Sequence, residues 1–142
     1  MNPRDLQLNQ AQPAHSPHLL LWDRFDDLQL KAIAYHYDLE IISYRQNLLS
    51  RISPNCSFLA LHQNLERELK AIRQICNSSN KKVVILRDLD CLITYLQMQS
   101  ESPITLFWQT LFDARHLESI LWILLPYKLA PPMWTESRLQ RL

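Results

Sequence analysis

The chain has 142 residues, of which 47% are apolar, and its 15 basic and 14 acidic side chains leave a formal net charge of +1. The apolar content excludes wholesale disorder, and one folded domain is the expected number for this length. The balanced charge provides no overall field that would favour nucleic acid or an anionic membrane. Glycine is absent, although an average usage of roughly 7% would give about ten glycines.

The cysteines and histidines do not predict a metal site. Cys56, Cys76 and Cys91 lack the short paired spacing of a zinc site or a redox motif, and the five histidines are scattered. We therefore expect reduced thiols and a cytoplasmic protein. Residues 1–17 contain no run resembling a signal peptide and are expected to form a flexible arm before a single domain at 18–142. The longest apolar run, 120–126, is too short to cross a bilayer, so no membrane association is expected.

The first predicted element is a strand at 18–22, a continuous apolar run of the length expected for a strand buried on both faces. A helix follows, with Asp26 and Asp27 suited to its N-terminal dipole and apolar residues behind them as far as Tyr37. The β-branched run 39–44 predicts a second strand. Residues 46–52 return to helical spacing before Pro54 ends the helix.

The second half of the chain continues this alternation. Residues 61–76 have apolar side chains at steps of three and four, which predicts an amphipathic helix. A turn at 77–80, a strand at 82–86, a helix at 89–96, a helix opened by Pro103 and a strand at 119–125 follow. This order predicts an α/β fold of three layers, with a mostly parallel sheet of four to five strands and helices on both faces. Ligands of such sheets lie at the carboxyl ends of the strands.

The stretch 83–92, with the sequence VVILRDLDCL, resembles the second nucleotide motif of P-loop ATPases of the AAA+ branch. In that family a buried strand ends in an Asp-Glu pair, followed by an apolar residue, another acid and a leucine, and 87–92 is similar at every position but the first. Residues 39–52 look like the family's second strand and helix. Residues 120–132 with Arg138 resemble its sensor strand, proline-containing loop and nearby arginine. The resemblance implies a P-loop NTPase-like fold over most of 18–142.

The positions that would carry ATP hydrolysis depart from the family pattern. In place of the phosphate loop the chain has the acid-rich run Asp23-Arg24-Phe25-Asp26-Asp27. Arg87 replaces the aspartate expected to hold Mg²⁺, and Leu125-Pro126 offers no polar sensor. We therefore expect no catalytic residues, no binding of ATP or Mg²⁺ and no ATPase activity.

The acids of the second motif have two interpretations. The preferred one is that Asp88 and Asp90 cap the following helix and complement its dipole, because acids belong in a first helical turn. Catalysis is the alternative. Arg87 is predicted to pair with an acid such as Asp23 or Asp88, and such a pair would replace the charge balance of Mg²⁺ and phosphate.

The C-terminal segment is the predicted protein interface. Trp134 follows two prolines and lies near several basic residues, a mixture that is common at interface hot spots. Docking of this segment on its own sheet is the alternative. The candidate interface residues are Trp108, Tyr127, Met133, Trp134, Arg138 and Arg141.

A second group of basic residues invites a nucleic-acid interpretation. Glu66 and Glu68 dilute its charge, so a solvated helix face is the preferred explanation. The group consists of Arg67, Lys70, Arg73, Lys81 and Lys82.

These observations favour a non-catalytic ATPase-like domain that acts as a protein-binding or assembly subunit of a larger complex. The alternative is an accessory, nucleic-acid-associated ATPase-like component of a phage-defence or mobile-element system. Short P-loop proteins of the BREX defence type look similar in strand–helix order and length, although their glycine-lysine loop is absent here. A third alternative is a thiol enzyme, since Cys91, Asp113 and His116 supply a nucleophile, an orienting acid and a base.

Overall fold

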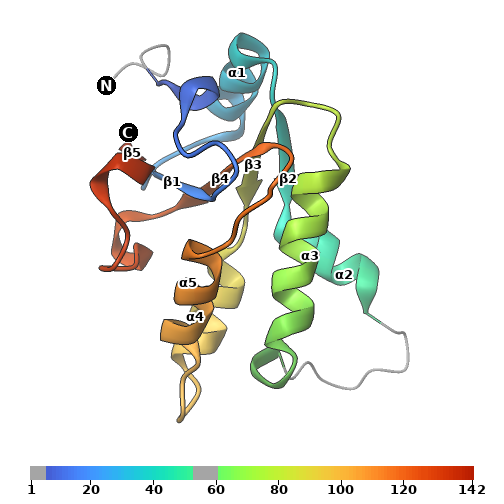
Figure 1. The fold of residues 1–142 in the computed structure, drawn as a ribbon, viewed down its shortest axis with the longest axis vertical. Helices are drawn as coiled ribbons and strands as arrows, with labels where there is room; N and C mark the ends of the chain where they lie inside the picture. The colour runs from blue at the N-terminus through green and yellow to red at the C-terminus, as the bar shows by residue number, and fades with distance from the viewer. Residues whose placement is uncertain (1–5, 53–60) are drawn as a thin grey trace.

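The computed structural model of the chain describes residues 6–52 and 61–142. Five strands form one sheet in the order β2-β3-β4-β1-β5, and every neighbouring pair is parallel. Figure 1 shows β2 and β5 at opposite edges of this sheet. The strands are β1 (His18–Leu21), β2 (Glu40–Ser43), β3 (Val83–Arg87), β4 (Ile120–Leu125) and β5 (Leu139–Arg141).

Helices connect the parallel strands, as this kind of sheet requires. The predicted α/β class and the parallel sheet with helices on both faces are therefore confirmed. The α-helices are α1 (Asp27–Tyr37), α2 (Tyr44–Arg51), α3 (Leu65–Ser78), α4 (Asp90–Gln97) and α5 (Ile104–Phe112). The short 3₁₀ helices are η2 (Leu8–Gln10), η3 (Leu61–Gln63), η4 (Tyr127–Leu129) and η5 (Glu136–Arg138).

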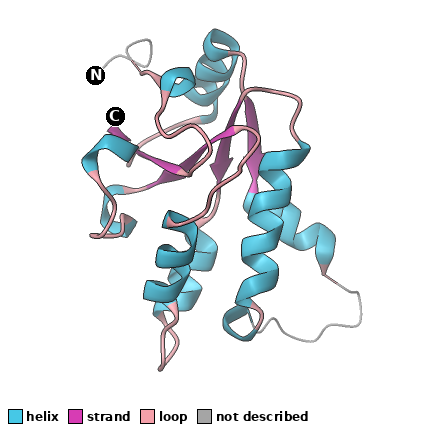
Figure 2. Cartoon of the chain, in the orientation of Figure 1, coloured by secondary structure: helices cyan, strands magenta, loops and turns pink. Residues whose placement is uncertain are grey.

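The two faces of the sheet bury separate apolar cores. Helices α2 to α5 cover one face, where they pack over residues such as Leu86 and Ile123. Helix α1 and the N-terminal segment cover the other face, over Ile85 and Trp122. Successive residues of β3 thus enter different cores, because side chains alternate along a strand. Figure 2 shows helices on both sides of the strands, which gives the three layers that the sequence predicts.

Three described residues take the left-handed backbone conformation that glycine usually fills. These are Asp38 with φ 51°, Asp88 with φ 66° and His116 with φ 66°. Aspartate and histidine tolerate this region better than most residues. The chain therefore ends α1 at Asp38 and turns after β3 at Asp88 without a glycine.

Residues 6–17 pack on the sheet, which differs from the flexible arm that the sequence suggested. Leu6 and Leu8 are 3% and 0% exposed. The Nε1 atom of Trp122 donates to the carbonyl oxygen of Leu8 at 2.9 Å. The physical reason is that a buried parallel sheet needs cover on both faces, and this segment covers β4 beside α1. Residues 1–5, like Pro54 and Cys56, lie outside the described residues.

Candidate functional site

The candidate site lies where the parallel strands have their carboxyl ends, which we call the carboxyl edge of the sheet. In the sheet, β1 lies between β4 and β5. The chain leaves β1 through α1 on one face of the sheet and leaves β3 through α4 on the other face. Open α/β sheets bind ligands at the edge where their connections diverge in this way. The positions predicted as a degenerate nucleotide site, 23–27 and 87–90, lie at this edge, where β1 and β3 end.

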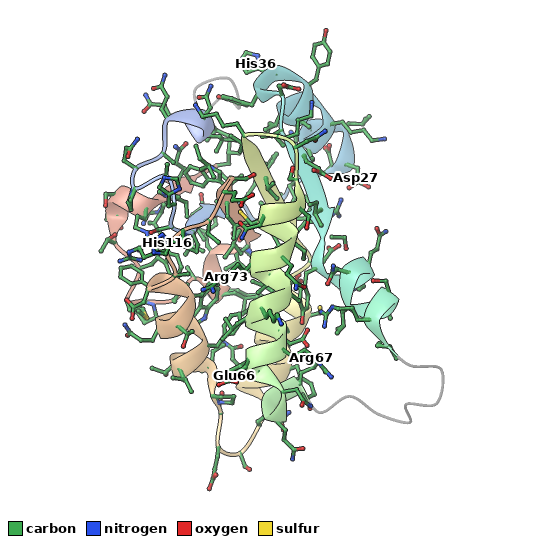
Figure 3. All side chains as sticks on the ribbon, turned by 45° about the vertical axis from the view of Figure 1, so that its right-hand side comes forward. Asp27, His36, Glu66, Arg67, Arg73 and His116 are labelled. Carbon is green, nitrogen blue, oxygen red and sulfur yellow. The ribbon has the colours of Figure 1, made fainter. Side chains whose placement is uncertain are left out.

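Arg87 joins α1 to the end of β3 through ion pairs. Its Nη1 donates to Oδ1 of Asp27 at 2.8 Å, and its Nε lies 3.5 Å from Oδ1 of Asp88. Its guanidinium carbon lies 5.5 Å from the centre of the Phe25 ring. The hydrogen bond to Asp27 raises the pKa of Arg87, so the guanidinium stays charged. Asp88 is thus a partner, as predicted, but Asp27, labelled at the start of α1 in Figure 3, takes the place expected for Asp23.

Asp88 connects the ends of β2 and β3. Ser43 Oγ donates to Oδ2 of Asp88 at 2.5 Å, and the same hydroxyl accepts the backbone N–H of Gln46 as the N-cap of α2. The predicted capping role does not hold for Asp88, because the N-cap of α4 is Leu89, which forms no side-chain cap. Asp90 lies in the first turn of α4, where the helix dipole favours an acid.

The other acids after β1 accept hydrogen bonds from the backbone. Asp23 Oδ1 accepts the N–H of Tyr127 at 2.7 Å, which joins the end of β1 to η4. Asp26 Oδ1 accepts the N–H of Gln29 at 2.7 Å as the N-cap of α1. In a phosphate site, N–H groups at a helix start face the anion. Here a protein carboxylate occupies one of them, while Arg24 is exposed beside it.

This arrangement balances charge between elements of the protein itself. Carboxylates from α1 and from the turn after β3 surround the cation of Arg87, which weakens its attraction for any further anion. Among the described residues, no group of three or more His, Cys, Asp or Glu could hold a metal ion. The edge therefore carries ion pairs and hydrogen bonds that cross-link elements of the chain.

Three of the predicted interface residues are buried within the domain. Trp108 and Trp134 are 4% and 6% exposed, and their rings meet edge to face with centres 5.7 Å apart. Arg138 is 5% exposed and lies 4.2 Å from the centre of the Phe112 ring. The C-terminal segment thus docks on its own domain, because burial of these rings stabilises the fold.

The remaining candidate interface residues stay near the surface. Tyr127 is 37% exposed, and its hydroxyl donates to the carbonyl oxygen of Leu142 at 2.7 Å. Met133 is half-buried. Arg141 is exposed and forms two hydrogen bonds with Glu136, at 2.7 and 2.8 Å.

Arg138 is a buried cation that forms no ion pair with another described residue. Its Nε and Nη2 donate to the carbonyl oxygen of Pro17 at 3.0 and 2.6 Å, and its Nη1 donates to that of Phe112 at 3.1 Å. Burial, followed by repulsion from Arg115, lowers the pKa of Arg138 to about 10. The side chain therefore remains charged at neutral pH and fixes η5 to the start of β1 and the end of α5.

The proposed thiol triad is divided between opposite ends of the sheet. Cys91 follows the carboxyl end of β3, whereas Asp113 and His116 precede the amino end of the parallel strand β4. The five residues of β3 span roughly 16 Å. Burial also raises the pKa of the Cys91 thiol, which disfavours the nucleophilic thiolate. This geometry argues against a thiol enzyme.

The second group of basic residues is partly neutralised. Arg67 Nε lies 3.1 Å from Oε2 of Glu68, and Lys81 Nζ lies 2.6 Å from Oδ1 of Asp38. Figure 3 shows Arg67 along α3 together with Glu66 and Arg73. This mixture of charges is typical of a solvated helix face.

Glu68, which the sequence marks only as an acid among the basic residues of its helix, has a buried carboxylate that is 0% exposed. Tyr44 Oη donates to its Oε1 at 2.6 Å, and Arg51 donates to both of its oxygens at 2.7 and 3.1 Å. Burial alone would raise the pKa of Glu68, but these hydrogen bonds outweigh it and hold the pKa below its ordinary value. The available signal was position, since Glu68 stands three residues after Leu65 and four before Ile72, within the apolar stripe of α3.

Comparison with known proteins found no match among family models, curated proteins or solved structures. Within the described residues, no helix has both the length and the apolarity that a bilayer crossing requires. The function is therefore inferred from the fold and the geometry of the candidate site.

Proposed function

We propose that this chain is a non-catalytic, P-loop NTPase-like domain of the AAA+ type that acts as a protein-binding or assembly subunit of a larger complex. The ion pairs of Arg87 with Asp27 and Asp88 carry the proposal. Arg87 stands where the family resemblance would place the Mg²⁺ ligand. Its partners are protein carboxylates, so the charge balance that metal and phosphate would provide comes from the chain itself.

Two further features support the loss of nucleotide binding. Helix α1 begins with Asp26 and Asp27, whose charges would repel a triphosphate. Strand β4 ends in Leu125 followed by Pro126, which places no side-chain donor at the carboxyl edge. Phosphoryl transfer depends on positioning and charge stabilisation, so a site without these groups would lack the activity altogether.

Exposed apolar side chains support a role in binding proteins. On α1, Leu28 and Tyr35 are 79% and 92% exposed, and Ala32 is exposed between them. These three residues share one face of the helix, whereas Leu30 and Ile33 are buried on another. A helix that is apolar on two faces is typical of one that packs on both sides.

Titration of the full chain with a fluorescent ATP analogue in the presence of Mg²⁺ tests the loss of nucleotide binding. We expect no saturable change in anisotropy, because the cradle and the metal ligand are missing. A P-loop ATPase with an intact phosphate loop is the positive control. Saturable binding with micromolar affinity, displaced by unlabelled ATP, would overturn the proposal.

Co-purification from the native host tests the assembly role. A Tyr35→Ser variant is expected to lose the partner, whereas Gln29→Ser, an exposed change on the same helix, should retain it. Elution of the parent chain as a monomer without any partner would contradict the assembly role.

A further inference from the structure

We propose that the groove between α5 and the residues after β4 binds a partner segment that presents an apolar side chain next to a carboxylate. The proposal rests on the function proposed above and states the chemistry of the partner. The groove has a volume of about 220 Å³. It is formed by the start of α5, by Gln97 at the end of α4 and by residues 128–133.

The walls of the groove are mainly apolar. Ile104 and Trp108 line it from α5, and Leu129, Ala130 and Met133 line it from the opposite side. An apolar side chain that entered this space would leave water for contact with aliphatic and aromatic surface. The first requirement on the partner is therefore a large aliphatic or aromatic side chain.

The groove is preformed. Pro126, Pro131 and Pro132 fix the backbone of the segment after β4, since the proline ring locks φ. On the other wall, the Trp108 ring packs edge to face on Trp134, whose ring centre in turn lies 5.2 Å from that of Phe112. A partner would thus bind without the loss of conformational entropy that ordering these walls would require.

Lys128 sets the second requirement on the partner. It is the one charged side chain among the residues that line the groove. It is exposed and forms no ion pair with any residue that the structure describes. A carboxylate beside the inserted apolar group would complement this cation, which favours an acidic and apolar segment over a basic one.

Selection from a random-peptide phage library against the full chain tests this chemistry. We expect the selected peptides to be enriched in aromatic or large aliphatic residues close to an Asp or Glu. A synthetic peptide of the strongest clone is then titrated into protein labelled with ¹³C at the methionine methyl groups. Because the chain has 3 methionines and Met133 lines the groove, the Met133 signal should shift on binding.

Matched variants locate the binding. Ala130→Trp fills the groove and should weaken peptide binding at least tenfold, whereas Ala130→Ser should leave it within about twofold. Lys128→Gln should weaken binding by up to about fivefold, in keeping with an exposed ion pair. The control Lys82→Gln changes an exposed lysine outside the groove and should have no effect. Urea unfolding curves confirm that each variant is folded.

The proposal would be overturned by a lack of enriched peptides, by peptides dominated by basic residues, or by binding that Ala130→Trp does not weaken. Occupation by a second copy of the chain would appear as concentration-dependent self-association in sedimentation velocity that Ala130→Trp abolishes, and this too would overturn the assignment to a separate partner. Binding of the ATP analogue would overturn the proposed function and leave the peptide result intact, so the two failures are distinguishable.

Discussion

Arg87 illustrates how one residue determines which charges a site can accept. A carboxylate at this position would offer oxygen to a hard cation such as Mg²⁺. The guanidinium instead attracts carboxylates, and it pairs with Asp27 from a segment 60 residues away. Asp27 at the start of α1 and Arg87 at the end of β3 therefore compensate each other's charge.

His18 provides a test at the scale of a residue. It is 0% exposed, its Nε2 lies 2.9 Å from the carbonyl oxygen of Pro13, and its ring centre lies 5.0 Å from that of Trp122. Burial, together with repulsion from Arg138, lowers the pKa of His18 below its ordinary value of 6.5. Below pH 6.5 the unfolded chain binds a proton that the folded chain still resists, so the free energy of unfolding should fall as the pH drops.

Urea unfolding at a series of pH values through this range measures that dependence. The His18→Gln variant, which cannot take up the proton, should lose this part of the slope. The exposed His36→Gln should keep the slope of the parent chain. An unchanged slope in His18→Gln would show that the neutral form of His18 is not favoured in the folded state.

At the scale of elements, the absence of glycine means that other residues must adopt the backbone conformations of tight turns. Asp38, Asp88 and His116 hold positive φ values at the end of α1, after β3 and before β4. A side chain with a Cβ atom costs free energy in this conformation. These turns persist because the packed elements on either side fix their geometry.

Substitution of His116, which is exposed, tests this cost. His116→Gly should be at least as stable as the parent, and His116→Val should be about 1–2 kcal/mol less stable than His116→Gly. The free energies come from urea unfolding. At Glu118, which is exposed and has no positive φ, the order should reverse, with valine the more stable. The same order at both positions would contradict the explanation.

At the scale of the whole molecule, the apolar core between the sheet and α1 depends on residues far apart in the chain. Leu6, Leu8 and Ala11 join residues of α1, β3 and β4 on one face of the sheet. Small domains have marginal stability, so the loss of one buried leucine is a large change. The N-terminal segment is thus expected to contribute to global stability.

Leu8→Ala tests this contribution. Removal of a leucine that is 0% exposed should lower the free energy of unfolding by about 2–4 kcal/mol. The measurement is urea unfolding followed by circular dichroism, with the exposed Gln10→Ala as the matched control. Equal stabilities for the two variants would show that the segment contributes little.

The elements that the sequence predicted well are those with a local signal. Apolar runs near 18–22, 82–86 and 119–125 coincide with β1, β3 and β4 because continuous burial leaves a continuous apolar pattern. The β-branched run 39–44 coincides with β2, which is half-buried. Strand β5 has the sequence Leu139-Gln140-Arg141 and pairs only with β1, so no such run marks it. The arginine at position 87, where the ATPase motif has an aspartate, was likewise visible in the sequence, because an alignment of the motif requires only the order of the residues.

Which residues contact one another within the chain depended on the tertiary structure. The choice of Asp27 over Asp23 for Arg87, the burial of Trp134 and the packing of Leu8 on Trp122 join residues distant in the chain. Local preferences do not contain these contacts, because they arise only when the order of the strands brings the segments together. The sequence by itself thus determined the five α-helices, the strands β1 to β4, the α/β class and the residues at the carboxyl edge. The fold decided which of those charges meet and which aromatic side chains are buried, since burial and pairing are properties of the packed chain.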